Sequence, residues 1–435
     1  MRSPSSAGAL PAPMVEVALD VLGEGKALFP SPSPCAPSPM IPLLEGLRIL
    51  DLTSVILGPY ATQILGDFGA EIIKVEPPDG DSMRLVAPVN VGMVSAIFAN
   101  NNRNKRSVVL DLKTEGGRVA LMKLLPTADA FVHNMRQQAL DKLGFTYKAV
   151  RAANPHIVYA AAVGFGRHGR YAGKPAYDDV IQAASGFAGL FQMRDGAPLY
   201  APTIAADKVS GLHLAHAVLA ALLYRQRTGR APGYVEVPMF ELMAAFSLSE
   251  HLSHATFDAG GKVGYVRVLS PGRKPYRTKD GWVGVLPYTE RNWTKILHEI
   301  GRAEVTKLAW FKHATERSQR VDELYAILAE ALTGRSTAEW LSVFERLDIP
   351  HAPVRTPDDL LEDPHLADVG FFATKFASET PVKRTLRQAV NVDEVADLPD
   401  LPPPALGADT AAVLREAGCT EAEIAAATAT HRDLA

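Results

Sequence analysis

Short apolar runs alternate with segments of helical periodicity from Gly46 to about residue 166. The run "LRILDLT" has the length and apolar content of a buried strand. After a Gly58–Pro59 turn, the helical segment "YATQILGDFGA" leads into a second strand, "EIIKVE". The alternation continues through "RSVVLDL", "DAFVHNM" and "HIVYAAAVGFG". This pattern predicts an α/β fold with an open, largely parallel, doubly wound, Rossmann-like sheet.

A long apolar helix is predicted between Ala201 and Arg230. Apolar positions recur at helical spacing at Leu212, Ala215, His216, Leu219, Leu222 and Leu223. Asp207 lies where this mostly buried helix should begin. An aspartate there can cap the helix by accepting hydrogen bonds from the free N–H groups of the first turn. A cap also keeps a carboxylate ionised and fixed, as a nucleophile requires, so both interpretations can hold.

The pattern changes from about residue 260. We expect a hairpin around Lys279–Asp280–Gly281, then helices over "ERNWTKILHEIG" and "VDELYAILAEAL". Ser336-x-x-Glu339 and Thr420-x-x-Glu423 have the spacing of capping boxes. These features predict a smaller α+β domain, followed by a helical tail that rejoins the first domain.

Residues 1–40 contain eight of the 32 prolines, interspersed with alanine and serine. Such a composition cannot bury a core, so a disordered extension is expected. The predicted divisions are therefore 1–40 for the extension, 41–258 for the large domain, 259–350 for the small domain and 351–435 for the tail.

Charge and cysteine content exclude several classes of protein. The 435 residues carry 45 lysines and arginines against 48 acids, with no run of five like charges, so neither nucleic acid nor a membrane surface is an expected partner. The two cysteines, Cys35 and Cys419, lie far apart without metal-ligand spacing, and no metal site is expected. No apolar run long enough to span a membrane occurs, and we expect a cytoplasmic protein.

A nicotinamide cofactor is not expected, although Glu76 ends the second strand where such enzymes place a ribose-binding acid. The first strand-to-helix turn, "TSVILGPYATQILG", lacks the G-x-G-x-x-G pattern that lets the backbone approach a pyrophosphate.

Several longer motifs together resemble those of the family III CoA-transferases, also called the CaiB/BaiF family. They include "PLLEGLRILDLTSVILGPYATQILGDFGAEIIKVEPPDGDSMR", "NRNKRSVVLDLK", "ADAFVHNMRQQALDKLGFTY", "PAYDDVIQAASG" and "LLYRQRTGRAPGYVEVPMFE". The resemblance extends from about Pro42 to the C-terminus.

The resemblance implies transfer of CoA from an acyl-CoA thioester to a free carboxylic acid, with no tightly bound cofactor. In that chemistry an aspartate attacks the donor, giving a mixed anhydride and then an aspartyl-CoA thioester that the acceptor cleaves. Asp207 occupies the matching position. The family also implies a homodimer of interlocked chains, with the active site between the large domain of one chain and the small domain of the other.

The resemblance further implies that CoA lies at the mouth of the large domain. The matching or adjacent positions are Val55, Ile56, Lys105, Arg106, Leu110, Lys113, Asn134, Met135 and Lys142. The cations suit phosphate groups, as does Arg84, although a lone lysine or arginine is also commonly a solvated surface charge. Tyr177 and Asp178 are expected to line the pantetheine or acyl pocket. Gly186 and Gly189 supply either oxyanion donors or only loop flexibility.

Two alternative functions remain. The 2-methylacyl-CoA racemases share the fold, but their histidine falls at Tyr177, and a phenol with a pKa near 10 is a poor replacement base. A non-catalytic acyl-CoA-binding subunit would not need an acid at Asp207. The oxalate-using formyl-CoA transferases carry a glutamine where this chain has Ile56, so a small, strongly polar acceptor such as oxalate is not favoured; donor and acceptor are not otherwise identified.

Overall fold

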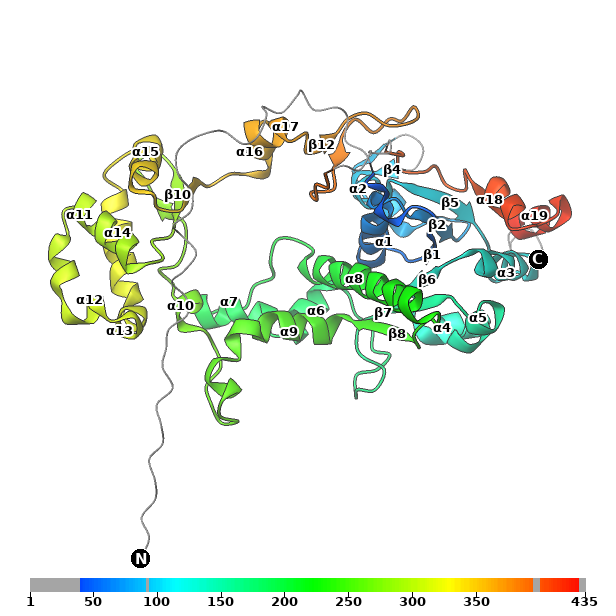
Figure 1. The fold of residues 1–435 in the computed structure, drawn as a ribbon, viewed down its shortest axis with the longest axis horizontal. Helices are drawn as coiled ribbons and strands as arrows, with labels where there is room; N and C mark the ends of the chain where they lie inside the picture. Colours follow the sequence, from blue (N-terminus) through cyan, green and yellow to red (C-terminus); the bar gives the residue numbers. More distant parts are fainter. Residues whose placement is uncertain (1–39, 91–93, 394–399, 430–435) are drawn as a thin grey trace, which may run out of the picture. The chain divides into compact units, whose positions relative to one another are not determined.

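The computed structural model describes residues 40–90, 94–393 and 400–429, so the predicted disordered extension lies, apart from Met40, outside the described residues. The main sheet has six strands in the order β5-β2-β1-β6-β7-β8, and every neighbouring pair is parallel (Figure 1). Its strands are β1 (Arg48–Leu52), β2 (Glu71–Glu76), β5 (Lys105–Val109), β6 (Ala130–His133), β7 (Val158–Val163) and β8 (Val235–Pro238). The predicted parallel α/β sheet is confirmed.

The strand order places a switch point between β1 and β6. Numbered along the chain, the six strands read 3-2-1-4-5-6, so the chain winds outward first in one direction and then in the other. The loops after β1 and β6 therefore leave the sheet in opposite directions and open a crevice at its carboxyl edge. Ligands of such sheets bind there.

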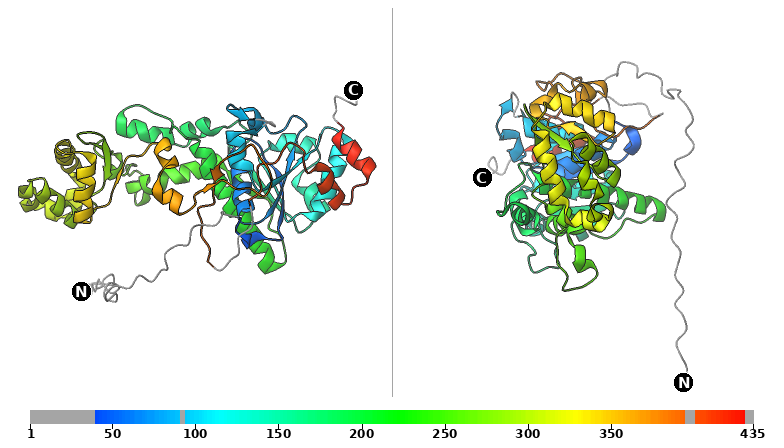
Figure 2. Two further views of the ribbon diagram at one scale, coloured as in Figure 1. Left: turned by 90° about the horizontal axis from the view of Figure 1, so that it is seen from above. Right: turned by 90° about the vertical axis from the view of Figure 1, so that its left-hand side faces the viewer.

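Alternate strand residues face two different hydrophobic cores. Ile49 and Ile72 pack toward one face, while their neighbours Leu50 and Ile73 pack toward the other. Figure 2 shows helices covering both faces of the sheet. The helices of the first face are α1 (Leu57–Asp67), α8 (Ala205–Thr228) and α9 (Met239–His251). Those of the second are α3 (Glu115–Leu124), α5 (Tyr147–Ala153), α18 (Thr410–Glu416) and α19 (Glu421–Thr428).

The C-terminal helices complete the second face. Helix α18 contacts β5, and α19 packs along α3. Val413 and Ile424 are buried in the same core as Leu50. The predicted capping box at Thr420 and Glu423 is present at the start of α19.

Residues 276–353 have a hydrophobic core of their own, which includes Trp293, Leu324 and Phe344. An antiparallel sheet of β9 (Tyr276–Arg277), β10 (Trp282–Val285) and β11 (His351–Pro353) packs with α11 (Glu290–Glu299), α14 (Val321–Leu332) and α15 (Thr337–Leu347). The predicted hairpin is confirmed, because β9 pairs with β10 across residues 278–281. The predicted capping box of Ser336 and Glu339 begins α15.

Shorter elements connect these parts. The helices and 3-10 turns are η1 (Pro42–Leu44), η2 (Ser82–Leu85), α2 (Ala96–Asn102), η3 (Leu125–Thr127), α4 (Gln137–Lys142), α6 (Asp178–Ala184), α7 (Phe187–Asp195), η4 (Ser253–Thr256), α10 (Val266–Leu269), η5 (Ala303–Lys307), α12 (Ala309–Lys312), α13 (Ala314–Gln319), α16 (Pro357–Leu361) and α17 (Pro364–Asp368). The remaining strands are β3 (Val89–Asn90), β4 (Val94–Ser95), β12 (Phe372–Ala373) and β13 (Thr385–Leu386). None of the helices in the described ranges is both long and apolar enough to cross a membrane.

Helix α8 is present as predicted, but its buried face differs from the predicted one. Leu212, His216 and Leu223 are exposed. The buried positions are Ala206, Asp207, Ser210, Gly211, Leu214, Ala215, Val218, Ala221 and Leu222. Apolar residues lie all round this helix, so periodicity alone could not decide which side packs against the sheet.

Gly211 allows α8 to approach α1 closely. A Cβ atom at this position would lie 2.7 Å from the carbonyl oxygen of Leu57 and 3.0 Å from the ring of Tyr60. The start of α8, which carries Asp207, is thereby held against the start of α1.

Gly211→Ala should therefore lower the free energy of unfolding by about 1–3 kcal/mol, because the backbone of α1 must move to admit the methyl group. Gly189→Ala in α7 is the matched control, since its added Cβ would have no atom within 4 Å. That variant should gain up to about 1 kcal/mol from helix propensity. Urea unfolding measures both changes, and equal stability of the two variants would contradict the close contact.

Candidate functional site

A cavity of about 740 Å³ opens at the carboxyl edge of the main sheet. The segments that follow β1, β6 and β7 line it, so it lies at the switch point between β1 and β6. Five of the predicted site residues line this cavity: Val55, Asn134, Met135, Tyr177 and Asp207. The fold thus brings together residues that are up to 152 positions apart in the sequence (207 − 55).

Asp207 is the third residue of α8 and lies in the cavity wall with only 8% of its surface exposed. Its backbone N–H donates to Asp178 Oδ1 at 2.9 Å. The N-cap residue is Ile204, which provides no side-chain cap. No hydrogen bond to the Asp207 carboxylate is present in the described part of the chain. The predicted capping role is wrong, because the helix begins at Ala205 and places the aspartate beyond the N-cap.

Burial, and to a smaller extent the nearby carboxylate of Asp178, together raise the pKa of Asp207 to about 7. The carboxyl group therefore titrates near neutral pH, which marks it as a candidate functional group.

Asp178 is fixed from two sides. Its carboxylate accepts one hydrogen bond from the backbone N–H of Asp207 and another from Gln182 Nε2 at 2.5 Å. Gln182 is itself held in place, because its Oε1 accepts a hydrogen bond from the backbone N–H of Ala201 at 3.0 Å. Asp178 is thus adjacent to Asp207 although it does not itself line the cavity. Tyr177, the residue before it, is 69% exposed and does line the cavity.

The turn after β1 forms another part of the wall. Ser54 N–H donates to Asn134 Oδ1 at 3.0 Å, and Asn134 Nδ2 donates to the Ser54 carbonyl at 2.8 Å. Both ends of the Asn134 amide are therefore occupied in joining the loops of β1 and β6. Ile56 is buried beneath this turn as the N-cap residue of α1.

The predicted contact of Lys105 with CoA is wrong. Its side chain is fully buried and donates to Asp51 Oδ2, Thr62 Oγ1, Asn102 Oδ1 and the Pro59 carbonyl at 2.8–3.1 Å. A lysine that points inward from a strand and meets these acceptors has no proton left for a ligand.

The predicted positions of Arg106, Leu110 and Arg84 at the CoA site are also wrong. Arg106 pairs with Glu71 and Glu416 near the amino ends of the strands, at the edge opposite the cavity. Leu110 is buried in the core of the second face. Arg84 is buried in an ion pair with Glu76 at 2.6 Å.

Lys113 and Lys142 are exposed, but neither lines the cavity, and the same is true of Gly186 and Gly189. Their proposed roles stay predictions.

Four cationic side chains that the sequence analysis missed do line the cavity: Arg136, Lys148, Arg167 and Lys174. Arg167 lies over the ring of Tyr234 at 4.3 Å and near Glu236 at 3.7 Å. The other three have no ion pair within the described residues. Such unpaired cations suit a ligand that carries phosphate groups. Arg136 directly follows the predicted Asn134–Met135 pair, and this adjacency was the available signal.

Residues 44–410 match the family model described as CoA-transferase family III. The chain belongs to this family. The family predicted from the sequence motifs is thus confirmed, and the chain is a CoA-transferase, an enzyme class that uses CoA thioesters as substrates.

Relatives of this CoA-transferase extend along most of its length. A probable fatty acyl-CoA transferase of Mycobacterium tuberculosis is 32% identical over 407 residues, which cover 89% of this chain and 99% of the relative. The acetyl-CoA:oxalate CoA-transferase of Acetobacter aceti is 33% identical over 318 residues, or 71% and 80% of the two chains. A solved CAIB/BAIF family protein from Brucella suis has a TM-score of 0.74 at 27% identity and covers 87% of this chain and 100% of its own.

The stability of the CoA-transferase should depend on pH through Asp207. Because its folded pKa of about 7 lies above the unfolded value of 3.8, this group favours the folded state most at low pH, and the benefit is lost as pH rises through 7. Asp207→Asn removes the buried charge. We expect the variant to be more stable than the unmodified protein by roughly 2–4 kcal/mol at pH 8, with little difference near pH 4.

Melting temperatures measured across this pH range test the expectation. Asp179→Asn changes an exposed acid in the first turn of α6 and serves as the control, for which no comparable pH-dependent gain is expected. A constant difference between Asp207→Asn and the unmodified protein at every pH would show that Asp207 is solvated like an ordinary surface acid.

Proposed function

We propose that this enzyme transfers CoA from an acyl-CoA thioester to a free carboxylic acid through a covalent intermediate on Asp207. The observation that carries the proposal is a carboxylate in the wall of a 740 Å³ cavity, without a hydrogen-bond partner in the described residues. A carboxylate with few solvating groups keeps its electron pairs available for attack on a carbonyl carbon.

The proposed reaction has four balanced steps. An Asp207 oxygen attacks the donor carbonyl carbon, and the C–S bond breaks to give a mixed anhydride and CoA thiolate. The thiolate attacks the aspartyl carbonyl, releasing the donor acid and leaving an aspartyl-CoA thioester. The acceptor carboxylate attacks this thioester, forming a second anhydride and freeing the thiolate again. Attack of the thiolate on the acceptor's carbonyl gives the new acyl-CoA and restores Asp207.

The cavity also offers groups for the nucleotide end of CoA. Arg136, Lys148 and Lys174 line it without acidic partners in the described residues, which supports contacts to the CoA phosphates. Val55 and Met135 form an apolar part of the cavity wall, against which the pantetheine arm of CoA can pack.

The acceptor class is set only broadly. The names of the relatives include oxalate, glutarate and fatty acyl substrates, so we propose a carboxylic acid acceptor without choosing among them.

We also propose that the enzyme is a homodimer. Phe246, Leu248 and Leu252 on or just after α9 have exposed fractions of 51%, 42% and 39%. Apolar surface of this kind is commonly covered by a partner chain. A second copy would add residues to the active site, as the family resemblance implies.

Asp207→Asn should abolish covalent capture of CoA. Incubated with an acyl-CoA donor alone, the unmodified enzyme should gain the mass of CoA less one water, located by mass spectrometry on the peptide that contains Asp207. The variant should gain none, and its transfer rate should fall roughly a thousandfold or more, because the amide is a poor nucleophile. A panel of succinyl-, acetyl- and longer acyl-CoA donors with oxalate, glutarate and fatty acid acceptors identifies the active pair.

Asp179→Asn is again the matched control, since its acid lies exposed one residue beyond Asp178. It should retain both the mass shift and transfer. If folded Asp207→Asn protein still transferred CoA at the unmodified rate, the covalent mechanism would be wrong.

The donor half-reaction should slow as pH falls below 7. Protonation of Asp207, whose pKa is about 7, removes the nucleophile, so kcat/KM for the donor should drop about tenfold per pH unit on the acid side. Rapid-quench measurement of donor-acid release between pH 5 and pH 9 gives this profile. A plateau down to pH 5 would mean that the nucleophile has an ordinary aspartate pKa.

A further inference from the structure

Val55, in the wall of the cavity, has a backbone conformation that its side chain disfavours. Its φ angle is +71°, in the left-handed region. Among the non-glycine residues with positive φ in the described ranges, Val55, Asn104, Ser253 and Asp348, it alone is β-branched. A branched Cβ clashes with the backbone there, so such a residue persists only where its surroundings hold it.

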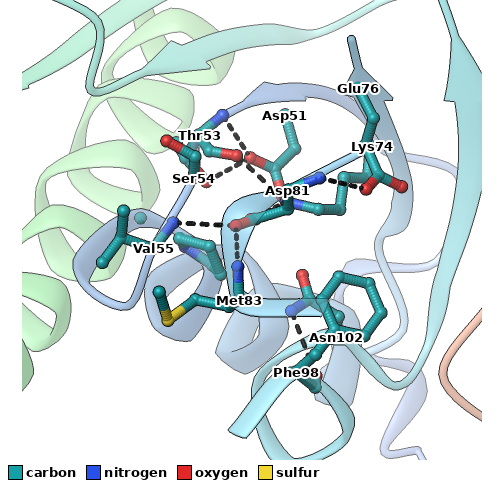
Figure 3. Close-up of polar contacts among 12 residues, drawn as sticks. Asp51, Thr53, Ser54, Val55, Lys74, Glu76, Asp81, Met83, Phe98 and Asn102 are labelled. Atoms are coloured by element: carbon teal, nitrogen blue, oxygen red, sulfur yellow. Dashed lines mark hydrogen bonds and ion pairs between the residues drawn. The ribbon is translucent and has the colours of Figure 1, made fainter. Parts of the chain in front are cut away.

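One carboxylate holds the turn that contains Val55. Asp81 Oδ1 accepts the N–H of Val55 at 3.3 Å and the N–H of Met83 at 3.0 Å, while Oδ2 accepts from Lys74 Nζ at 2.9 Å (Figure 3). The side chains of Lys74 and Asp81 are 0% and 1% exposed, so water does not compete for these bonds.

The partner of Asp81 holds the other side of the same turn. Lys74 Nζ also donates to the Thr53 carbonyl at 3.0 Å. Thr53 N–H in turn donates to Asp51 Oδ1 at 2.9 Å. The Lys74–Asp81 ion pair therefore binds the turn at two points, the carbonyl of Thr53 and the backbone N–H of Val55.

The loop that carries Asp81 is anchored as well. Glu76 Oε2, at the end of β2, accepts the N–H of Asp81 at 3.0 Å and the Nε of Arg84 at 2.7 Å. Glu76 Oε1 accepts from Arg84 Nη2 and from Ser107 Oγ. Figure 3 shows Asp81, Lys74 and Glu76 close together beside the turn. The position of the Asp81 carboxylate is thus fixed independently of Val55.

We propose that Lys74 and Asp81 are positioning residues that hold Val55 in its left-handed conformation, so that its side chain forms the wall against which CoA binds. Glycine would adopt this backbone without strain but would supply no side chain for the wall. The identity of the ligand rests on the proposed function, whereas the strain and its restraint stand on the geometry of the turn.

Asparagine cannot replace Asp81 in this role. Its single carbonyl oxygen can accept from Val55 or from Lys74, and the amide group would turn N–H protons toward the remaining donor. Asp81→Asn therefore loses one of the two restraints on the turn.

The strain is tested with Val55→Ala and Val55→Gly, which leave the ion pair intact. If Val55 is held in a strained conformation, Val55→Gly should melt at a higher temperature than Val55→Ala, although glycine normally costs stability through its unfolded state. A melting temperature of Val55→Ala equal to or above that of Val55→Gly would overturn the proposal. This comparison does not depend on whether Asp81 variants fold.

The restraint is tested by titrating free CoA calorimetrically into Asp81→Asn, Val55→Gly and the double variant. Asp81→Asn alone should weaken CoA binding about tenfold, because Val55 relaxes out of the wall. In the Val55→Gly background the same change should weaken binding no more than about twofold, since no strain remains to be restrained. If Asp81→Asn weakened CoA binding by the same factor in the unmodified protein and in the Val55→Gly variant, the proposal would be overturned.

Asp67→Asn is the matched control for a damaged buried ion pair. Asp67 pairs with buried Arg103 at the far end of α1 and does not line the cavity. This variant should lose stability, yet its affinity for CoA should stay within twofold of that of the unmodified enzyme. A larger loss of CoA affinity would mean that the Asp81→Asn effect arises from general destabilisation, and it would overturn the proposal.

Failure of the two proposals is distinguishable. If the unmodified protein did not bind CoA, the proposed function would fail and the wall would have another ligand. If it bound CoA and captured it on Asp207 while Asp81→Asn acted independently of residue 55, only the positioning role would fail.

Discussion

Four buried charged side chains form two ion pairs around β1 and β2: Lys105 begins β5, Asp51 and Lys74 lie on β1 and β2, and Asp81 lies in the loop after β2. Lys105 pairs with Asp51 at 3.1 Å and Lys74 with Asp81 at 2.9 Å, all of them buried. Removing one partner of such a pair leaves an uncompensated charge and costs about 3–5 kcal/mol. Their net contribution to stability is small by comparison, but they fix geometry. These two ion pairs position the turn after β1, the start of α1 and one wall of the cavity.

Two buried aspartates in this chain show how neighbours decide the chemistry of one residue type. Burial disfavours the charge on Asp51, yet Lys105 and Lys74, with hydrogen bonds from Thr53 and Thr62, lower its pKa below the ordinary value. Burial likewise raises the pKa of Asp207, and its charged neighbour is another acid, Asp178. Asp51 is therefore an inert structural anion, whereas Asp207 is a base near neutral pH that lies open to a ligand.

The site depends on two helices that start at the same edge of the sheet. Helix α1 begins directly after the restrained turn, and α8 begins two residues before Asp207. Gly211 brings the two helices into backbone contact, with no side chain between them. Asp207 and the proposed CoA wall consequently lie beside adjoining helix starts, and the cations that line the cavity come from more exposed segments around it.

The sequence by itself determined the parallel α/β sheet, the hairpin at residues 278–281, the two capping boxes and, through its motifs, the CoA-transferase family. Periodicity, turn chemistry and motif spacing are local, so they can be read without knowing what packs against them. Tertiary structure decided that Lys105 and Arg84 point inward, that Arg106 lies at the opposite edge, that Leu212 and Leu223 face outward on α8, and that Asp207 is no cap. Lys105 is buried because the fold brings its amine to Asp51 on β1, and Lys74 because a loop brings Asp81 to it. Which strands are neighbours is set by the packing of the whole chain, and the spacing of residues along the sequence does not carry that information.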